Sequence, residues 1–218
     1  NYFEDRISAE KRLPEAIDRK LLSPFQYFCV TDTVDLSKLK WSRKGYEIRE
    51  LDNLYTNNDM RSNMIITSIN KYVTDINSVI GLGFCAGVEH AIYMANYFNN
   101  NGISSIALHG KSSDEERNDA KRKLVNGEIK FIFVVDLYNE GVDIPEVNTI
   151  LFLRPTESLT VFLQQLGRGL RLSENKECLT VLDFVGQAHK NYNFEEKFRA
   201  LVGRTSNSIK KYIEDGFL

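Results

Sequence analysis

The sequence predicts an α/β protein built on a parallel sheet of about six strands flanked by helices. Two patterns indicate this class. Short apolar strands alternate with helices of about ten to fifteen residues, which is typical of βαβ units. The strand-like runs, such as residues 131–135 (FIFVV), are continuously apolar, as expected of parallel strands buried on both faces.

Composition agrees with one folded domain. Of 218 residues, 42% are hydrophobic and 27% charged, which excludes a disordered chain. The net charge of −2 excludes a polycation but not nucleic-acid binding through a local patch. Cys29, Cys85 and Cys178 form no CxxC pair, so we expect neither disulfide nor zinc, and a reducing, cytoplasmic location. No apolar run approaches the ~18 residues of a membrane helix.

The first sixty residues give a weak pattern of strands and short helices. Pro14 predicts the start of a helix that runs to about Leu22. Residues 25–30 (FQYFCV) are dense in aromatic side chains and predict a strand. Charges dilute the pattern from residue 31 to residue 59, where the sparse apolar anchors are Trp41, Tyr46 and Ile48.

A regular alternation follows. An apolar stripe at helical spacing predicts a long helix over about residues 59–76. The strands predicted after it are 78–84, 104–108, 131–135, 148–153 and 178–184. The helices predicted after it are 88–98, 114–125, 156–170 and, near the end of the chain, 194–213.

Two glycine motifs imitate nucleotide sites. Residues 81–86 (GLGFCA) match the loose dinucleotide pattern, but no acidic residue follows between Asn99 and Leu108 to bind a ribose. Residues 110–112 (GKS) imitate the end of a P-loop, but Ser105 stands where that loop needs its first glycine. We therefore expect no nicotinamide site, and no ATP hydrolysis by this chain alone.

The loop after the most apolar strand, residues 136–145 (DLYNEGVDIP), is a candidate ligand site. Open parallel sheets bind ligands at the carboxyl ends of their strands. Gly141 permits tight backbone geometry, and Pro145 ends any helix begun at Leu137. The alternative is an ordinary connection in which Asp143 is a turn residue.

The next predicted helix carries two arginines on a narrow polar face. At about 100° per residue, Gln164, Arg168 and Arg171 share this face. The opposite face holds the apolar residues Leu159, Phe162, Leu163, Leu166 and Leu170. Two neighbouring guanidinium groups suit a bidentate clamp on phosphate oxygens. Gly167 and Gly169 each lower helix stability by about 1 kcal/mol relative to alanine. The alternative, a merely solvated helix face, would not require these glycines.

These segments resemble helicase motifs. Residues 164–171 (QQLGRGLR) resemble motif VI (Q-x-x-G-R-x-x-R) of the superfamily two helicases. Residues 140–145 (EGVDIP) resemble their motif V, and residues 84–91 (FCAGVEHA) resemble their motif IV. Residues 108–111 (LHGK), before a helix opened by residues 112–117 (SSDEER), fit the segment between these motifs.

The similarity is closest to DEAD/DEAH-type helicases of the type III restriction enzyme kind, and it runs from about Leu13 to Gly186. Residues 164–165 are Gln-Gln where DEAD-box proteins have His-Arg. Residues 134–136 are Val-Val-Asp where those proteins have Ala-Thr-Asp. These departures favour DNA over RNA as the partner.

The resemblance implies a RecA-like fold, the second lobe of a two-lobed ATPase without a P-loop of its own. Residues 1–24 would be the end of the first lobe or a linker, 25–190 the RecA-like domain, and 191–218 a helical extension. The partners implied are nucleic acid and the N-terminal RecA-like lobe of the same polypeptide, with no membrane. The alternative is a non-catalytic nucleic-acid-binding or scaffold domain of helicase descent.

The resemblance also assigns roles to residues. Arg168 and Arg171 would be arginine fingers that reach ATP and Mg²⁺ held mainly by the absent first lobe. Gln164 would line the same cleft, while Gly141 and Asp143 would lie by the ribose and couple the lobes. No metal is expected to be bound by this chain itself. The residues expected to contact the nucleic-acid backbone are Cys85, Ala86, Gly87, His109, Gly110, Lys111, Leu137, Tyr138 and Asn139.

The remaining polar and aromatic candidates have ordinary interpretations. His90 lies within a helix, where packing or surface exposure is expected rather than ligand binding. Asp183 and His189 could line the cleft, although nothing in their spacing requires it. The aromatic residues of the strand at 25–30 are expected to pack in the core rather than to stack on bases.

Overall fold

The computed structural model describes residues 13–42, 45–135, 144–156 and 158–189, together with Tyr192, Lys197 and Leu201. The helices in these residues are α1 (Leu13–Asp18), α2 (Ile48–Tyr55), α3 (Asp59–Tyr72), the 3-10 turn η1 (Ile76–Ser78), α4 (Val88–Asn100), α5 (Asp114–Val125) and α6 (Leu159–Gly169). The strands are β1 (Phe25–Asp35), β2 (Trp41–Ser42), β3 (Gly45–Tyr46), β4 (Gly81–Phe84), β5 (Ser105–Leu108), β6 (Phe131–Val134), β7 (Thr149–Phe152) and β8 (Leu179–Gln187).

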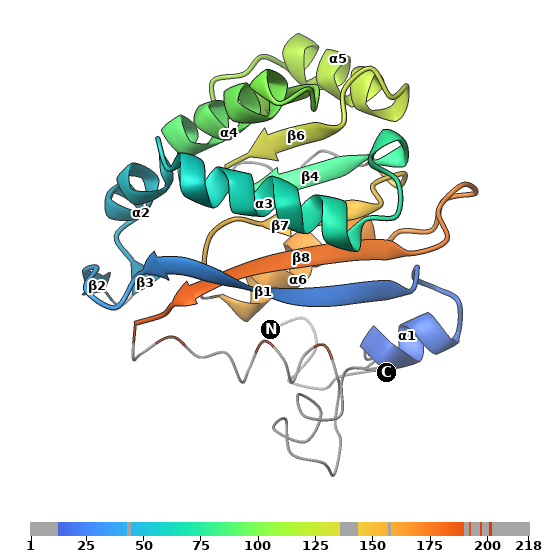
Figure 1. The fold of residues 1–218 in the computed structure, drawn as a ribbon. Coiled ribbons are helices and arrows are strands. Elements are labelled where there is room, and N and C mark those ends of the chain that lie inside the picture. The colour runs from blue at the N-terminus through green and yellow to red at the C-terminus, as the bar shows by residue number, and fades with distance from the viewer. Residues whose placement is uncertain are drawn as a thin grey trace, which may run out of the picture.

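Six of these strands form one parallel sheet in the order β1-β8-β7-β4-β6-β5. The prediction of a parallel sheet of about six strands is thus confirmed. Figure 1 shows α3 in front of this sheet and α6 behind it. The two short strands β2 and β3 form a separate antiparallel hairpin.

Hydrophobic cores lie on both faces of the sheet. Because successive strand residues point to opposite faces, Phe131 and Phe133 pack against α3 and α4, whereas Ile132 and Val134 pack against α5 and α6. Phe98 of α4 meets both phenylalanine rings edge to face, with centroids 5.4 and 4.8 Å away. This burial on both faces explains why the strands are continuously apolar in the sequence.

A smaller third cluster covers the carboxyl end of the sheet beside β1. It is built by α2 and the β2–β3 hairpin, and the predictions contained neither element. Its buried residues are Val34, Leu36, Tyr46, Leu51, Tyr55 and Ala86. Tyr46 is an anchor as predicted, whereas Ile48 is 49% exposed and the prediction for it was wrong.

Several element boundaries differ from the predictions. Strand β1 continues to Asp35 because it pairs with β8 along most of its length. Helix α3 stops at Tyr72, and the chain turns through η1 before β4 begins at Gly81. Of the helix predicted over residues 194–213, Lys197 and Leu201 are described, both helical and buried, and the rest lies outside the described residues.

The two glycines of α6 have different surroundings, and a matched pair of substitutions should separate them. A Cβ at Gly169 would lie 2.6 Å from Cδ1 of Leu179 and 2.8 Å from Cδ1 of Ile150, so α6 could not stay this close to the sheet. A Cβ at Gly167 would have nothing within 4 Å. Gly169→Ala should therefore lower the free energy of unfolding by about 1–3 kcal/mol. Gly167→Ala should raise it by about 0.5–1 kcal/mol.

Urea denaturation of the two variants beside the parent chain measures both changes. Equal effects of the two substitutions would contradict the packing of α6 against β7 and β8.

Candidate functional site

The register of the parallel strands brings the candidate loops to one edge of the sheet. Phe84, at the end of β4, pairs with Val134 of β6 and Phe152 of β7. Leu108, at the end of β5, pairs with the same Val134. The segments 85–87 and 109–111 therefore leave the sheet at the same, carboxyl edge, from the strands on either side of β6.

The loop between β4 and α4 is held by internal hydrogen bonds. Cys85 and Ala86 are each only 1% exposed. The Cys85 N–H donates to the Val134 carbonyl at 2.8 Å, and the Ala86 N–H donates to Nδ1 of His90 at 3.2 Å. Gly87 precedes α4, and a Cβ there would collide with the carboxylate of Asp52. The loop thus has a single tightly supported backbone path.

A buried guanidinium group supports this loop from below. Arg61 of α3 is 1% exposed, and its Nε donates to Asp32 Oδ2 at 2.6 Å. Its Nη2 donates to the Leu153 carbonyl at 2.8 Å, and its Cζ lies 3.9 Å from the centre of the Tyr55 ring. One side chain therefore joins β1, α2, α3 and the end of β7. Such a buried pair is costly to break from one side, because the other charge would be left uncompensated.

His90 links this network to the loop. The ring is fully buried, with Nε2 3.5 Å from Nη1 of Arg61. The hydrogen bond from the Ala86 N–H requires an unprotonated Nδ1, which fits a neutral ring. Burial, and then the Arg61 charge, lower the pKa of His90 well below its ordinary value. The backbone N–H of His90 donates to Asp52 Oδ1 at 2.9 Å, so α2 caps the start of α4.

The loop between β5 and α5 is a tight turn with an exposed tip. The His109 N–H donates to Ser112 Oγ at 3.1 Å, and His109 Nδ1 accepts the Lys111 N–H at 3.2 Å. A capping box between Ser113 and Glu116 starts the helix. Lys111 lies on the surface, where its ammonium is accessible to an anion.

Helix α6 carries its polar face as predicted. Gln164 is exposed, Arg168 is half-buried, and Arg171 is exposed two residues beyond the end of the helix. Leu163 was predicted on the apolar face and is instead 37% exposed. Its neighbour Gln165 is buried, and its Oε1 has no hydrogen-bond partner among the described residues.

The remaining predicted site residues lie outside the described residues. These residues are Gly141, Asp143, Leu137, Tyr138 and Asn139. The chain is described again from Ile144, which is buried with Val147 in the core beneath α6. The structure thus describes α6 and the loops after β4 and β5, and the prediction that Gly141 and Asp143 share a cleft with Arg168 stays a prediction.

Asp183, a residue that could have lined the cleft, is instead part of the core. It is 2% exposed and accepts hydrogen bonds from the Tyr27 hydroxyl and the Lys197 ammonium. Burial and the Asp183 charge raise the pKa of Tyr27 well above its ordinary value. The Lys197 ammonium also lies 4.6 Å from the centre of the Phe162 ring. His189 stacks on Trp41 at 5.0 Å.

The predictions from sequence missed the Arg61 network. A signal was present, because Arg61, Ile65 and Ile69 are four residues apart and share the buried face of α3. An arginine on an otherwise apolar stripe needs a buried partner, and Asp32 is that partner. Asp52 gave no comparable signal, because it lies on a helix that the sequence pattern did not predict.

The six-stranded parallel sheet with helices on both faces defines the class of a RecA-like α/β domain. Residues 74–173 match the family model for the helicase conserved C-terminal domain. The chain is 27% identical over 183 residues to a Saccharomyces cerevisiae protein named as an ATP-dependent helicase, IRC3. That match covers 84% of this chain and only 26% of the relative's length.

Solved structures show the same fold. A fragment of an HsdR subunit of a type I restriction enzyme from Vibrio vulnificus superposes with a TM-score of 0.60 at 21% identity, over 82% of this chain and 35% of that one. The RNA helicase Prp28 from Chaetomium thermophilum, bound to ADP, superposes with a TM-score of 0.59 at 15% identity. That match covers 85% of this chain and 38% of the Prp28 chain. Residues 74–173 thus match the helicase conserved C-terminal domain, and the RecA-like fold predicted from the motifs is confirmed.

The described part of the chain offers neither a membrane-spanning helix nor a metal cluster. None of its helices is both long and apolar enough to cross a membrane. No three histidine, cysteine, aspartate or glutamate side chains within it are grouped closely enough to hold a metal ion.

The buried His90 ring makes stability sensitive to acid. Its folded pKa lies well below the ordinary 6.5, so at mildly acid pH the unfolded chain binds a proton that the folded chain does not. The contribution of His90 is fully present above about pH 6.5 and is lost as the pH falls below it, at up to about 1.4 kcal/mol per pH unit.

Urea denaturation between about pH 7 and pH 5 measures this slope. In His90→Asn, whose Oδ1 can still accept from the Ala86 N–H, the slope should be smaller. The matched control is His109→Asn in the partly exposed turn, which should keep the parent slope. An unchanged slope in His90→Asn would contradict the assignment.

Proposed function

We propose that this chain is the C-terminal lobe of an ATP-dependent nucleic-acid helicase or translocase. It would supply arginine fingers for ATP hydrolysis and part of the nucleic-acid track. The observation that carries the proposal is the arrangement at the end of α6, where Gln164 is exposed, Arg168 is half-buried, and Arg171 is exposed just beyond the helix. The match of residues 74–173 to the helicase C-terminal domain supports it.

Arg168 would contact the phosphates of ATP, and the other lobe would hold that ATP together with Mg²⁺. The surroundings of α6 fit an approaching phosphate, because a Cβ at Gly167 would have nothing within 4 Å. A guanidinium group on a packed helix is oriented before the reaction, so it can stabilise charge that develops in the transition state. Arg171 would bind the same phosphates, and Gln164 would line the cleft beside them.

The loops that follow β4 and β5 at the carboxyl edge of the sheet would hold the nucleic-acid backbone. Backbone groups of residues 85–87 and 109–111 would contribute, with Lys111 as the exposed cation. Cys85 and Ala86 are buried, so their side chains would not reach the ligand. Because these groups would bind phosphate rather than base edges, the base sequence would matter little. DNA is the proposed partner, following the departures from the DEAD-box motifs.

Replacing Arg168 should separate catalysis from folding. In the full-length protein, Arg168→Ala should lower steady-state ATP turnover by about 10³-fold or more, the scale for arginine fingers. Nucleotide affinity should fall much less, because the other lobe holds most of the triphosphate. The melting temperature of the isolated chain should barely change. The isolated chain itself should show no ATPase activity.

The matched control is Arg122→Ala on the exposed face of α5, where Arg122 pairs with Asp119 and Glu128. It should leave turnover unchanged. Full turnover in Arg168→Ala, or a mutant chain that unfolds several degrees early, would mean that Arg168 is a structural residue. A chain that binds nucleic acid within a protein lacking ATPase activity would favour the scaffold alternative.

The nucleic-acid track can be tested with the isolated chain. It should bind single-stranded DNA weakly, with a shallow dependence of log K on log salt. Lys111→Ala should reduce that slope by about 0.7, because the variant neutralises one phosphate fewer. Lys71→Ala, an exposed lysine in the last turn of α3, is the control and should keep the parent slope. Fluorescence anisotropy at several salt concentrations measures both, and tight sequence-specific binding would contradict the proposal.

A further inference from the structure

Lys176 lies in the turn between α6 and β8, and its ammonium group gathers three backbone carbonyls. The backbone N–H of Lys176 donates to the Ser173 carbonyl at 3.1 Å, which closes the turn. The Nζ donates to the carbonyls of Pro145 at 2.6 Å, Val147 at 3.1 Å and Gly169 at 2.9 Å. All three donors of the ammonium are therefore used.

The three carbonyls come from two separate segments of the chain. Gly169 is the last residue of α6 and adjoins Arg168. Pro145 and Val147 lie in the turn that enters β7, a few residues after Gly141 and Asp143 in the sequence. One side chain thus ties the arginine-bearing helix to the segment that follows the other predicted ATP residues.

The local packing makes this tie rigid. Val147 is fully buried, and Gly169 lets the end of α6 lie directly against Ile150 and Leu179. The carbonyls at the end of a helix carry partial negative charge, so a cation is favourable there. With its other two donors on the neighbouring turn, the ammonium restricts both the position and the direction of the end of α6.

We infer that Lys176 is a positioning residue of the ATPase site: it holds the Arg168 end of α6 in register with the segment that enters β7. This inference rests on the proposed function. Arginine fingers depend on accurate placement, and a displacement of about 1 Å can lower turnover by about 10²-fold.

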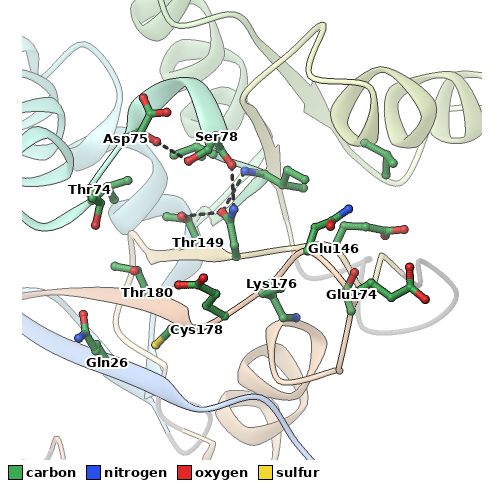
Figure 2. Close-up of a pocket in the computed structure, with 18 residues that line it drawn as sticks. Gln26, Thr74, Asp75, Ser78, Glu146, Thr149, Glu174, Lys176, Cys178 and Thr180 are labelled. Carbon is green, nitrogen blue, oxygen red and sulfur yellow. Dashed lines mark hydrogen bonds between the residues drawn. The ribbon is translucent and has the colours of Figure 1, made fainter.

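Lys176 is open to solvent on one side. It lines a groove of about 900 Å³ at the amino ends of β1, β4, β7 and β8 (Figure 2). Burial lowers the pKa of Lys176 to about 8, and the charge of Glu146 opposes this shift. The other titratable groups that line the groove are Asp75, Glu174, Glu177 and Cys178. A neutral amine keeps two N–H donors for three carbonyls, so the tie should loosen above about pH 8.

The test uses the full-length protein, saturated with nucleic acid. Lys176→Met should lower kcat for ATP hydrolysis by about 10- to 100-fold with a smaller change in KM, because the transition state is affected more than binding. Lys176→Arg keeps a cation that can donate to several carbonyls and should restore most of the lost activity. The parent should lose kcat above about pH 8, and in Lys176→Arg this loss should move to higher pH.

The matched control is Lys130→Met. The Lys130 ammonium also donates to a backbone carbonyl at the amino edge of the sheet, that of Asn77, and within the described residues it donates to neither α6 nor the turn that enters β7. This variant should keep the parent kcat and pH profile. Thermal melts of all variants show whether any loss of activity is a loss of folding.

The outcomes distinguish the inference from the proposed function. Parent-like turnover in folded Lys176→Met, while Arg168→Ala abolishes turnover, would overturn the inference alone. Parent-like turnover in both variants would overturn the proposed function as well. If Lys176→Met does not fold, Lys176→Arg decides, because an alkaline loss of kcat that stays near pH 8 would also overturn the inference.

Discussion

The register of the parallel sheet is the constraint on which the rest of the structure depends. Backbone hydrogen bonds place the ends of β4, β5, β6 and β7 level with one another. Every loop that follows a strand must therefore emerge at the same edge, while the residues that enter strands gather at the opposite edge. The first edge holds the candidate nucleic-acid loops, and the second holds the groove beside Lys176.

Buried charges join the outer elements to this sheet. The Arg61–Asp32 pair anchors α3 to the end of β1, and the Lys197–Asp183 pair brings a C-terminal residue against β8. Taking such charges out of water is expensive, so removing one partner of either pair would leave a costly uncompensated charge. His90 lies against Arg61 and accepts the Ala86 N–H, so it fixes the loop at residues 85–87 to this network. This explains how a segment of small residues keeps a defined path.

The sequence patterns predicted what depends on local periodicity. Apolar and aromatic runs located all six strands of the sheet, and helical spacing placed Gln164 on the exposed side of α6, with Arg168 half-buried. The predictions from sequence missed α2, although Ile48, Leu51 and Tyr55 recur there at helical spacing among charged residues. No local pattern could reveal the role of Lys176, because its partners are carbonyls of distant segments that meet only in the folded chain.

The central claim is that α6 faces the terminal phosphate of ATP bound between two lobes. The most direct test is photocrosslinking of the full-length protein, saturated with nucleic acid, by an ATP analogue with a photoreactive group on its γ-phosphate. Peptide mapping should find label on the peptide that contains residues 164–171, and excess ATP should abolish that label. Label confined to peptides outside this chain would contradict the account.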